Sequence, residues 1–78
     1  MDEPLIYARL TQIFQEVFDE AVVATPELTA DDIEGWDSIT NIRLMLTVEK
    51  SFKIKLSASE IGKLNNVGEL VMLIKDRT

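Results

Sequence analysis

The sequence predicts an all-α fold, a small four-helix bundle of three longer helices and one short third helix, with a long loop between the first two. Apolar residues recur at helical spacing in three segments of the 78-residue chain, and residue types that cap helices precede them. Only residues 53–56 alternate in polarity, and four residues are too few for a sheet without a partner strand. A chain of this length makes one domain, residues 1–78, with a modest core.

The first predicted helix covers residues 4 to about 22. Pro4 suits its first turn, because the N–H that proline lacks would be unpaired there. Its apolar face consists of Ile6, Leu10, Ile13, Phe14, Val17 and Ala21, widened by Tyr7 and Phe18. The opposite face is mainly acidic, whereas helices that lie on membrane surfaces have a basic polar face. We therefore expect this helix to pack against the core.

The segment 23–35 is predicted to be a loop with one helical turn. Thr29 is followed three residues later by Asp32, the pattern of a capping box. Leu28 and Ile33 are isolated apolar residues in polar surroundings, and we expect them to plug the end of the bundle.

The second predicted helix covers residues 38–52. Gly35 permits backbone angles that other residues avoid, and Asp37 is a strong N-cap type. Ser38 then lies near the surface at the positive end of the helix dipole, where an attached anion would meet free N–H groups. Trp36 is expected to close the end of the bundle, with contact to a partner as the alternative.

The same helix carries more apolar residues than one buried stripe requires. One stripe is Leu44, Met45, Val48 and Phe52, and the other is Ile39, Ile42 and Leu46. Two interpretations remain open: the second stripe is exposed as a docking surface beside Ser38, or the helix is central and buried on two sides.

Residues 53–56 are predicted to form an extended connector. Ser57 and Glu60 form a capping-box pattern that opens a short helix, and Asn66 with Glu69 repeats the arrangement before the last helix. The buried stripe of the last helix is Val67, Leu70, Val71 and Ile74, and that helix ends near residues 75–77.

Composition excludes several classes of function. The chain has no cysteine and no histidine, which removes most zinc sites, a cysteine nucleophile and a histidine general base. Its net charge of −6 argues against binding nucleic acid. The acids Asp31, Asp32 and Glu34 lack the spacing of a calcium-binding loop, so we expect no metal site. No apolar run is long enough to span a membrane and no signal peptide opens the chain, so we expect a cytoplasmic monomer.

With these features in place, the chain resembles acyl carrier proteins of the phosphopantetheine-binding carrier family. Asp37-Ser38-Ile39 is similar to the family's Asp-Ser-Leu signature, and Gly-Trp-Asp-Ser resembles free-standing bacterial carriers. The resemblance continues through the helix at 38–52, the spacing Phe52-x-Ile54-x-Leu56 and residues 66–70, and so covers essentially the whole chain.

The resemblance implies a carrier that is not itself an enzyme. Ser38, beside Asp37, would receive 4′-phosphopantetheine from coenzyme A through a separate phosphopantetheinyl transferase. The thiol of that arm would carry acyl groups as thioesters between loading ligases or synthases and acyltransferases of fatty-acid, polyketide or specialised lipid synthesis. The residues expected to contact partners are Trp36, Ile39, Ile42, Arg43, Leu46 and Ile61. Family analogy also predicts a shelter for the acyl chain near Leu46 and Ile61.

Two alternatives remain: a carrier of aminoacyl or D-alanyl groups, and a helical adaptor that only docks partners. One feature departs from the family, whose second helix is usually acidic toward its partners. Here that helix and the residues after it carry Arg43, Lys50, Lys53 and Lys55, and Glu49 is the only acid between Ser38 and Phe52. We hypothesise a specialised carrier that serves dedicated enzymes.

Overall fold

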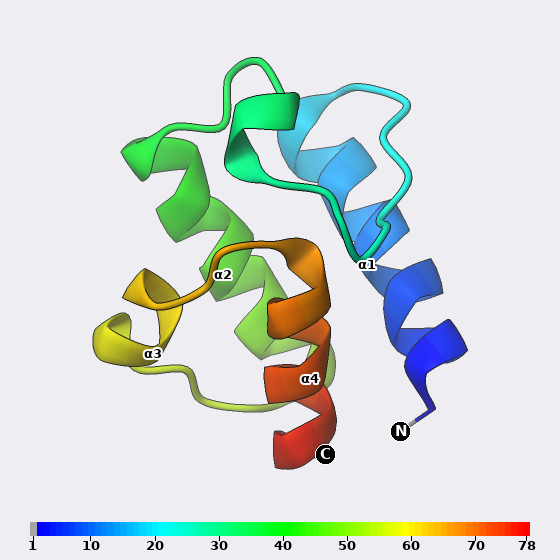
Figure 1. Cartoon of the computed structure of the whole chain (residues 1–78), viewed down its shortest axis with the longest axis vertical. Helices are drawn as coiled ribbons and strands as arrows, with labels where there is room; N and C mark the ends of the chain where they lie inside the picture. The colour runs from blue at the N-terminus through cyan, green and yellow to red at the C-terminus, as the bar shows by residue number, and fades with distance from the viewer. Residues whose placement is uncertain (1) are drawn as a thin grey trace.

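The computed structural model describes residues 2–78, and its described part is helical without strands, which confirms the predicted all-α class. The elements in chain order are α1 Glu3–Phe18, the 3₁₀ turn η1 Ala30–Asp32, α2 Ser38–Phe52, α3 Ala58–Gly62 and α4 Val67–Arg77. In Figure 1, α2 begins at the end of the molecule that the long α1–α2 loop crosses. The first turn of α1 and the last turn of α4 lie at the other end, where Lys75 Nζ and Glu3 Oε2 are 3.6 Å apart.

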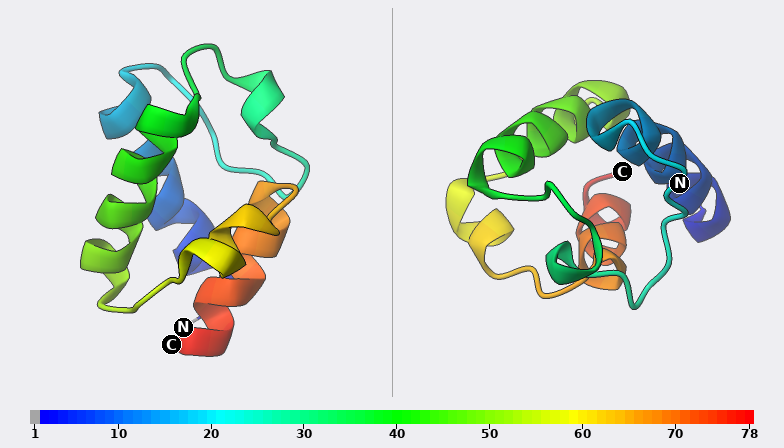
Figure 2. Two further views of the ribbon diagram at one scale, coloured as in Figure 1. Left: turned by 90° about the vertical axis from the view of Figure 1, so that its left-hand side faces the viewer. Right: turned by 90° about the horizontal axis from the view of Figure 1, so that it is seen from above.

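The core lies between α1, α2 and α4, which surround it on three sides in Figure 2. It consists of Ile6, Leu10, Ile13 and Phe14 of α1, Leu44, Met45, Val48 and Phe52 of α2, Val67, Leu70, Val71 and Ile74 of α4, and Ala24 and Leu56. The stripes predicted for α2 and α4 are confirmed residue by residue. Burial of apolar surface is the main stabilising force of such a bundle.

Helix α1 is shorter than predicted, because it ends at Phe18 rather than near residue 22. Asp19 adopts a left-handed conformation with φ +52°, which aspartate tolerates better than most residues, and this ends the helix. The chain then turns back, and Ala24 donates its N–H to the Thr11 hydroxyl at 3.0 Å. Ala21 is consequently exposed, and Ala24 is the buried alanine instead.

The α1–α2 loop is attached to the start of α4 through backbone groups. Val67 N–H donates to the Leu28 carbonyl at 2.8 Å, and Gly68 N–H donates to the Pro26 carbonyl at 3.0 Å. A Cβ on residue 68 would lie 3.0 Å from that carbonyl oxygen, so glycine permits the close approach. Of the two residues expected to plug the end of the bundle, Leu28 packs against the core while partly buried, and Ile33 is buried outside the main core cluster.

The single turn η1 forms where the sequence predicts it. Thr29 N–H donates to the carboxylate of Asp32 at 2.9 Å. The cap of α4 is confirmed only in part: Asn66 Oδ1 accepts the N–H of Glu69 at 2.9 Å, but the Glu69 carboxylate bonds Asn65 instead of Asn66. Either of the two adjacent asparagines could donate to the Glu69 carboxylate, and the sequence pattern does not show which one does.

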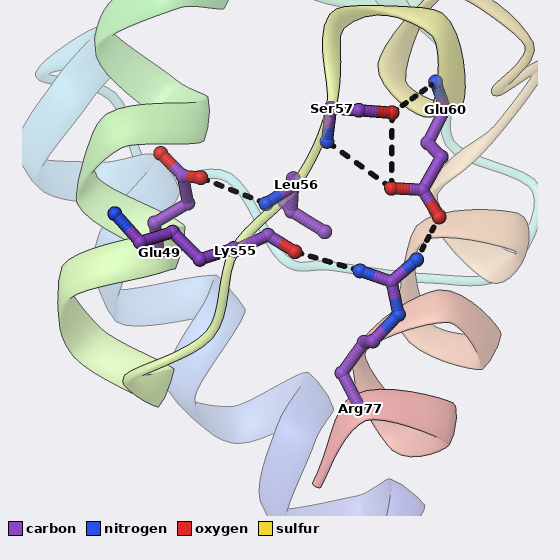
Figure 3. Close-up of polar contacts among 6 residues, drawn as sticks. All are labelled: Glu49, Lys55, Leu56, Ser57, Glu60 and Arg77. Carbon is purple, nitrogen blue, oxygen red and sulfur yellow. Dashed lines mark hydrogen bonds and ion pairs between the residues drawn. The ribbon is translucent and has the colours of Figure 1, made fainter.

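Helix α3 lies at the edge of the bundle and has no buried residue. Ser57 and Glu60 form the predicted capping box at its start. Figure 3 shows the polar contacts on either side of it: Arg77 of α4 donates to the Lys55 carbonyl at 2.7 Å and pairs with the Glu60 carboxylate. On the α2 side, Glu49 Oε2 accepts the N–H of Leu56 at 2.7 Å.

Candidate functional site

The site predicted from the sequence lies where the α1–α2 loop enters α2. Gly35 has φ +90°, a backbone angle that other residues avoid, as the sequence predicted for this glycine. The carboxylate of Asp37 accepts the N–H groups of Ile39 and Thr40, each at 3.0 Å. In return, Asp37 N–H donates to the Thr40 hydroxyl at 2.8 Å. Asp37 is therefore the N-cap of α2, as predicted.

The same hydrogen bonds set the charge of Asp37. The N–H of Thr40, and more weakly its hydroxyl and the N–H of Ile39, favour the carboxylate over the acid and hold the pKa of Asp37 below its ordinary value of 3.8. Asp37 is therefore ionised at neutral pH.

Ser38 is the first residue of α2 and is exposed. The structure corrects one detail of the expectation for an anion attached there. The N–H groups of Ile39 and Thr40 are taken by the Asp37 carboxylate, and that of Asn41 donates to the Asp37 carbonyl at 2.9 Å. The capping residue uses the same groups that an anion would need. An attached phosphate would meet the helix dipole, the N–H of Ser38 itself and solvent.

Trp36 closes the end of the bundle next to this cap. Its ring centroid lies 5.6 Å from that of Phe14 and 5.5 Å from that of Phe18. Its indole N–H donates to Asn41 Oδ1 at 3.0 Å, which satisfies the polar atom of a partly buried ring. The packing role is therefore shown, and contact of Trp36 with a partner stays a prediction.

The second apolar stripe of α2 is exposed, which resolves the two interpretations left open by the sequence. Ile39, Ile42 and Leu46 are 71%, 61% and 60% exposed, and they form what we call the outward row. Arg43 is also exposed and lies in sequence between two of them. Contiguous exposed apolar side chains on a small protein are typical of interaction surfaces.

A cavity of about 350 Å³ lies beside Ser38, between the start of α2, α3 and the start of α4. Trp36, Asp37, Ser38 and Asn41 contribute to it from the α2 side, and Met45, Ile61, Leu64, Val67 and Leu70 supply apolar walls. Its volume is at the lower end of the range for small-molecule pockets. Of the two residues expected to shelter a chain, Ile61 lines this cavity, whereas Leu46 does not line it and belongs to the outward row.

The site therefore has two parts. Trp36, Asp37, Ser38 and Ile61 meet at the cavity, while Ile39, Ile42, Arg43 and Leu46 face solvent. Sequence reasoning missed Asn41, Met45 and Leu64 as cavity residues. Met45 was assigned to the core stripe, and no sequence signal distinguishes a core position that also borders a cavity.

Two comparisons with known proteins bear on this geometry. The family model described as "Phosphopantetheine attachment site" matches residues 8–74, which is most of the chain. The chain belongs to this phosphopantetheine-attachment family. A solution NMR structure of the holo acyl carrier protein from Geobacter metallireducens is 40% identical and has a TM-score of 0.85. That similarity covers 91% of this chain and 83% of the other.

As a member of the phosphopantetheine-attachment family, the protein is a carrier rather than an enzyme, and a phosphopantetheine arm is attached to it covalently. The thiol at the end of such an arm supplies the sulfur that a chain without cysteine lacks. The residues of the site fit the group, because the exposed hydroxyl of Ser38 opens both to solvent and to the cavity.

Two absences among the described residues also characterise the molecule. Among residues 2–78, no three side chains of the metal-ligating types gather at one place. No helix in the same range has the length and apolar character needed to cross a bilayer.

Proposed function

We propose that Ser38 bears the 4′-phosphopantetheine arm and that the protein carries acyl groups on it as thioesters. The enzymes served would belong to fatty-acid, polyketide or specialised lipid synthesis. The observation that carries the proposal is the position of Ser38, exposed at the start of α2 and at the rim of an apolar-walled cavity of about 350 Å³. The chain has no histidine to act as a general base, and the Asp37 carboxylate is used by the cap of α2, so a separate transferase supplies the catalysis.

The cavity favours an acyl cargo over an aminoacyl or D-alanyl cargo. Met45, Ile61, Leu64 and Leu70 offer a hydrocarbon chain an apolar surface to cover. Burial of each methylene group stabilises the sheltered state by about 0.8 kcal/mol. An alanyl group has one methyl group to bury and would leave most of this surface uncovered.

The partners in this proposal are a phosphopantetheinyl transferase, an acyl-loading ligase or synthase, and acyltransferases. The outward row supplies apolar contacts beside the arm, and Arg43 adds a positive charge between them. Because complementary charge governs partner choice and encounter rate, Arg43→Glu should change which enzymes accept the protein. Unchanged partner preference in that variant would refute the idea of dedicated enzymes.

Attachment of the arm is tested by incubating the protein with a phosphopantetheinyl transferase, coenzyme A and Mg²⁺. Intact-mass spectrometry should show one added phosphopantetheine, and peptide mapping should place it on Ser38. Ser38→Ala should abolish the addition with little loss of stability, because Asp37 remains as the cap. Ser59→Ala is the matched control, since Ser59 is also exposed in the first turn of a helix. Addition to the Ser38→Ala protein would overturn the assignment.

Cargo is tested by loading the arm with an octanoyl or a D-alanyl group and recording backbone amide shifts by NMR. The octanoyl form should shift amides of residues 61–70, which border the cavity, and the D-alanyl form should not. Leu64→Trp, which fills the cavity, should remove the octanoyl shifts while leaving arm attachment unchanged. Equal shifts from both cargoes would contradict the sheltering role.

A further inference from the structure

The C-terminal end of α2 and the connector after it form a shallow groove that shares only Leu46 with the carrier site described above. Leu46 and Ile54 line this groove together with Lys50, Lys53 and Lys55. The three lysines are exposed. The groove therefore combines two apolar side chains with three ammonium groups, and we call it the lysine groove.

Glu49 is the only acid that lines the groove, and its carboxylate is committed to the backbone. Its Oε2 accepts the N–H of Leu56 at 2.7 Å, a charge-assisted bond that fixes the connector on α2 (Figure 3). With the charge of Glu49 counted, the groove still keeps an excess of two positive charges.

The ammonium groups have no ion-pair partner among residues 2–78, where the ion pairs are Lys75–Glu3 and Arg77–Glu60. The chain as a whole carries a net charge of −6, and residues 1–35 hold nine acids and one base. An acidic partner is therefore repelled by the segment 1–35 and attracted at the lysine groove. A field of this kind orients an approaching partner.

The lysine groove is continuous with the outward row, because Leu46 belongs to both. Helical rise places Lys53 roughly 22 Å along α2 from Ser38. A partner that receives the arm on Ser38 and lies along α2 thus reaches the groove with the far end of its contact surface.

We propose that the lysine groove binds an acidic segment of the partner enzyme, in which carboxylates flank one apolar side chain that covers Leu46 and Ile54. The proposal rests on the carrier role proposed above, since the same partner must receive the arm. A second copy of the chain is a poorer occupant, because two molecules of charge −6 repel each other.

Lys53 offers a clean variant for the test. It has φ +57° just after the end of α2, a position where glycine is favoured, so Lys53→Gly removes a charge while easing the backbone. Lys50→Gln is added to give a double variant. Lys63→Gln is the control, because Lys63 is exposed but lies outside the groove.

The probe is a short synthetic peptide in which pairs of glutamate alternate with leucine, titrated into the full-length chain and followed by NMR. Amide shifts should map to residues 46–55, and binding should weaken with added salt. The double variant should bind about threefold to tenfold more weakly, and Lys63→Gln should bind as the unmodified protein does. An acyl-transferring enzyme of the native host should load the double variant with a KM that is higher by a similar factor and with an unchanged kcat.

Besides failure of the peptide to bind, three results would overturn the proposal. In the first, a peptide with lysine in place of glutamate binds as tightly as the acidic peptide. In the second, residues 46–55 shift with phosphatidylglycerol vesicles and not with the acidic peptide. In the third, sedimentation shows a dimer that the Lys50 and Lys53 substitutions weaken. Arm attachment is measured on the same proteins. If Ser38 receives the arm and the peptide does not bind the groove, only this proposal fails; if no arm is added, the carrier role fails independently.

Discussion

Helices α2 and α3 both begin at a capped N-terminus, yet different forces attach them to the rest of the molecule. Helix α2 buries Leu44, Met45, Val48 and Phe52. Helix α3 buries none of its residues, and Ile61 is only partly covered. Its neighbours hold it instead through the Arg77 contacts to the Lys55 carbonyl and the Glu60 carboxylate.

This difference matters because both helices border the cavity beside Ser38. Moving α2 away from the core would expose its buried apolar side chains to water. Water can replace the exposed hydrogen bonds and ion pairs that hold α3, so opening the cavity on the α3 side costs less free energy. The cavity thus has a rigid side, from α2, and a compliant side, from α3. The proposed sheltering and release of a cargo would use the compliant side.

The largest expected effect compares a core leucine of α2 with a leucine that follows α3. Leu44 is fully buried in α2, so Leu44→Ala should lower the free energy of unfolding by about 2–5 kcal/mol. Leu64, just after α3, is partly buried, and Leu64→Ala should cost about 1 kcal/mol. Chemical denaturation measures both values. Equal losses would mean that α3 is as firmly packed as α2.

An intermediate effect is expected when the contacts of Arg77 are removed. Arg77→Ala should destabilise α3 locally by about 1 kcal/mol, because it removes one exposed ion pair and one hydrogen bond. Hydrogen exchange of amides in residues 55–62 should then be about fivefold faster, with little change in α2. Lys75→Ala is the control, since Lys75 pairs with Glu3 away from α3. Faster exchange in the control as well would show a global rather than a local effect.

The smallest expected effect concerns Asp37 at acid pH. Its pKa is lower in the folded than in the unfolded chain, so its contribution is complete above the unfolded value of about 3.8 and is lost as pH falls through the lower folded value. Thermal unfolding between pH 5 and pH 2 should therefore show a slightly smaller decrease in Tm for Asp37→Asn than for the unmodified protein, because Asn keeps a capping oxygen without titrating. Identical pH profiles would contradict the assigned pKa direction.

Much of the fold could be predicted because its signals are local. The bounds of α2, the caps at Asp37 and Ser57 and the buried stripe of α4 each depend on residues a few positions apart. The end of α1 was misplaced because apolar periodicity continues past Phe18, and nothing local reveals that Asp19 turns the chain. For the site, the position of Ser38 followed from the cap.

The sequence by itself determined most of the helices, their caps, and the exposed Ser38 beside the N-cap residue Asp37. These features follow from the spacing of residues along one helix. Only the tertiary structure decided that Ile39, Ile42 and Leu46 face solvent, that Met45 and Ile61 border a cavity, and that the Asp37 carboxylate uses the N–H groups expected for an anion. These features depend on how far apart three helices pack and on which groups meet across them. Pattern along the chain specifies which faces are apolar, but the packing of distant segments specifies which of those faces are covered.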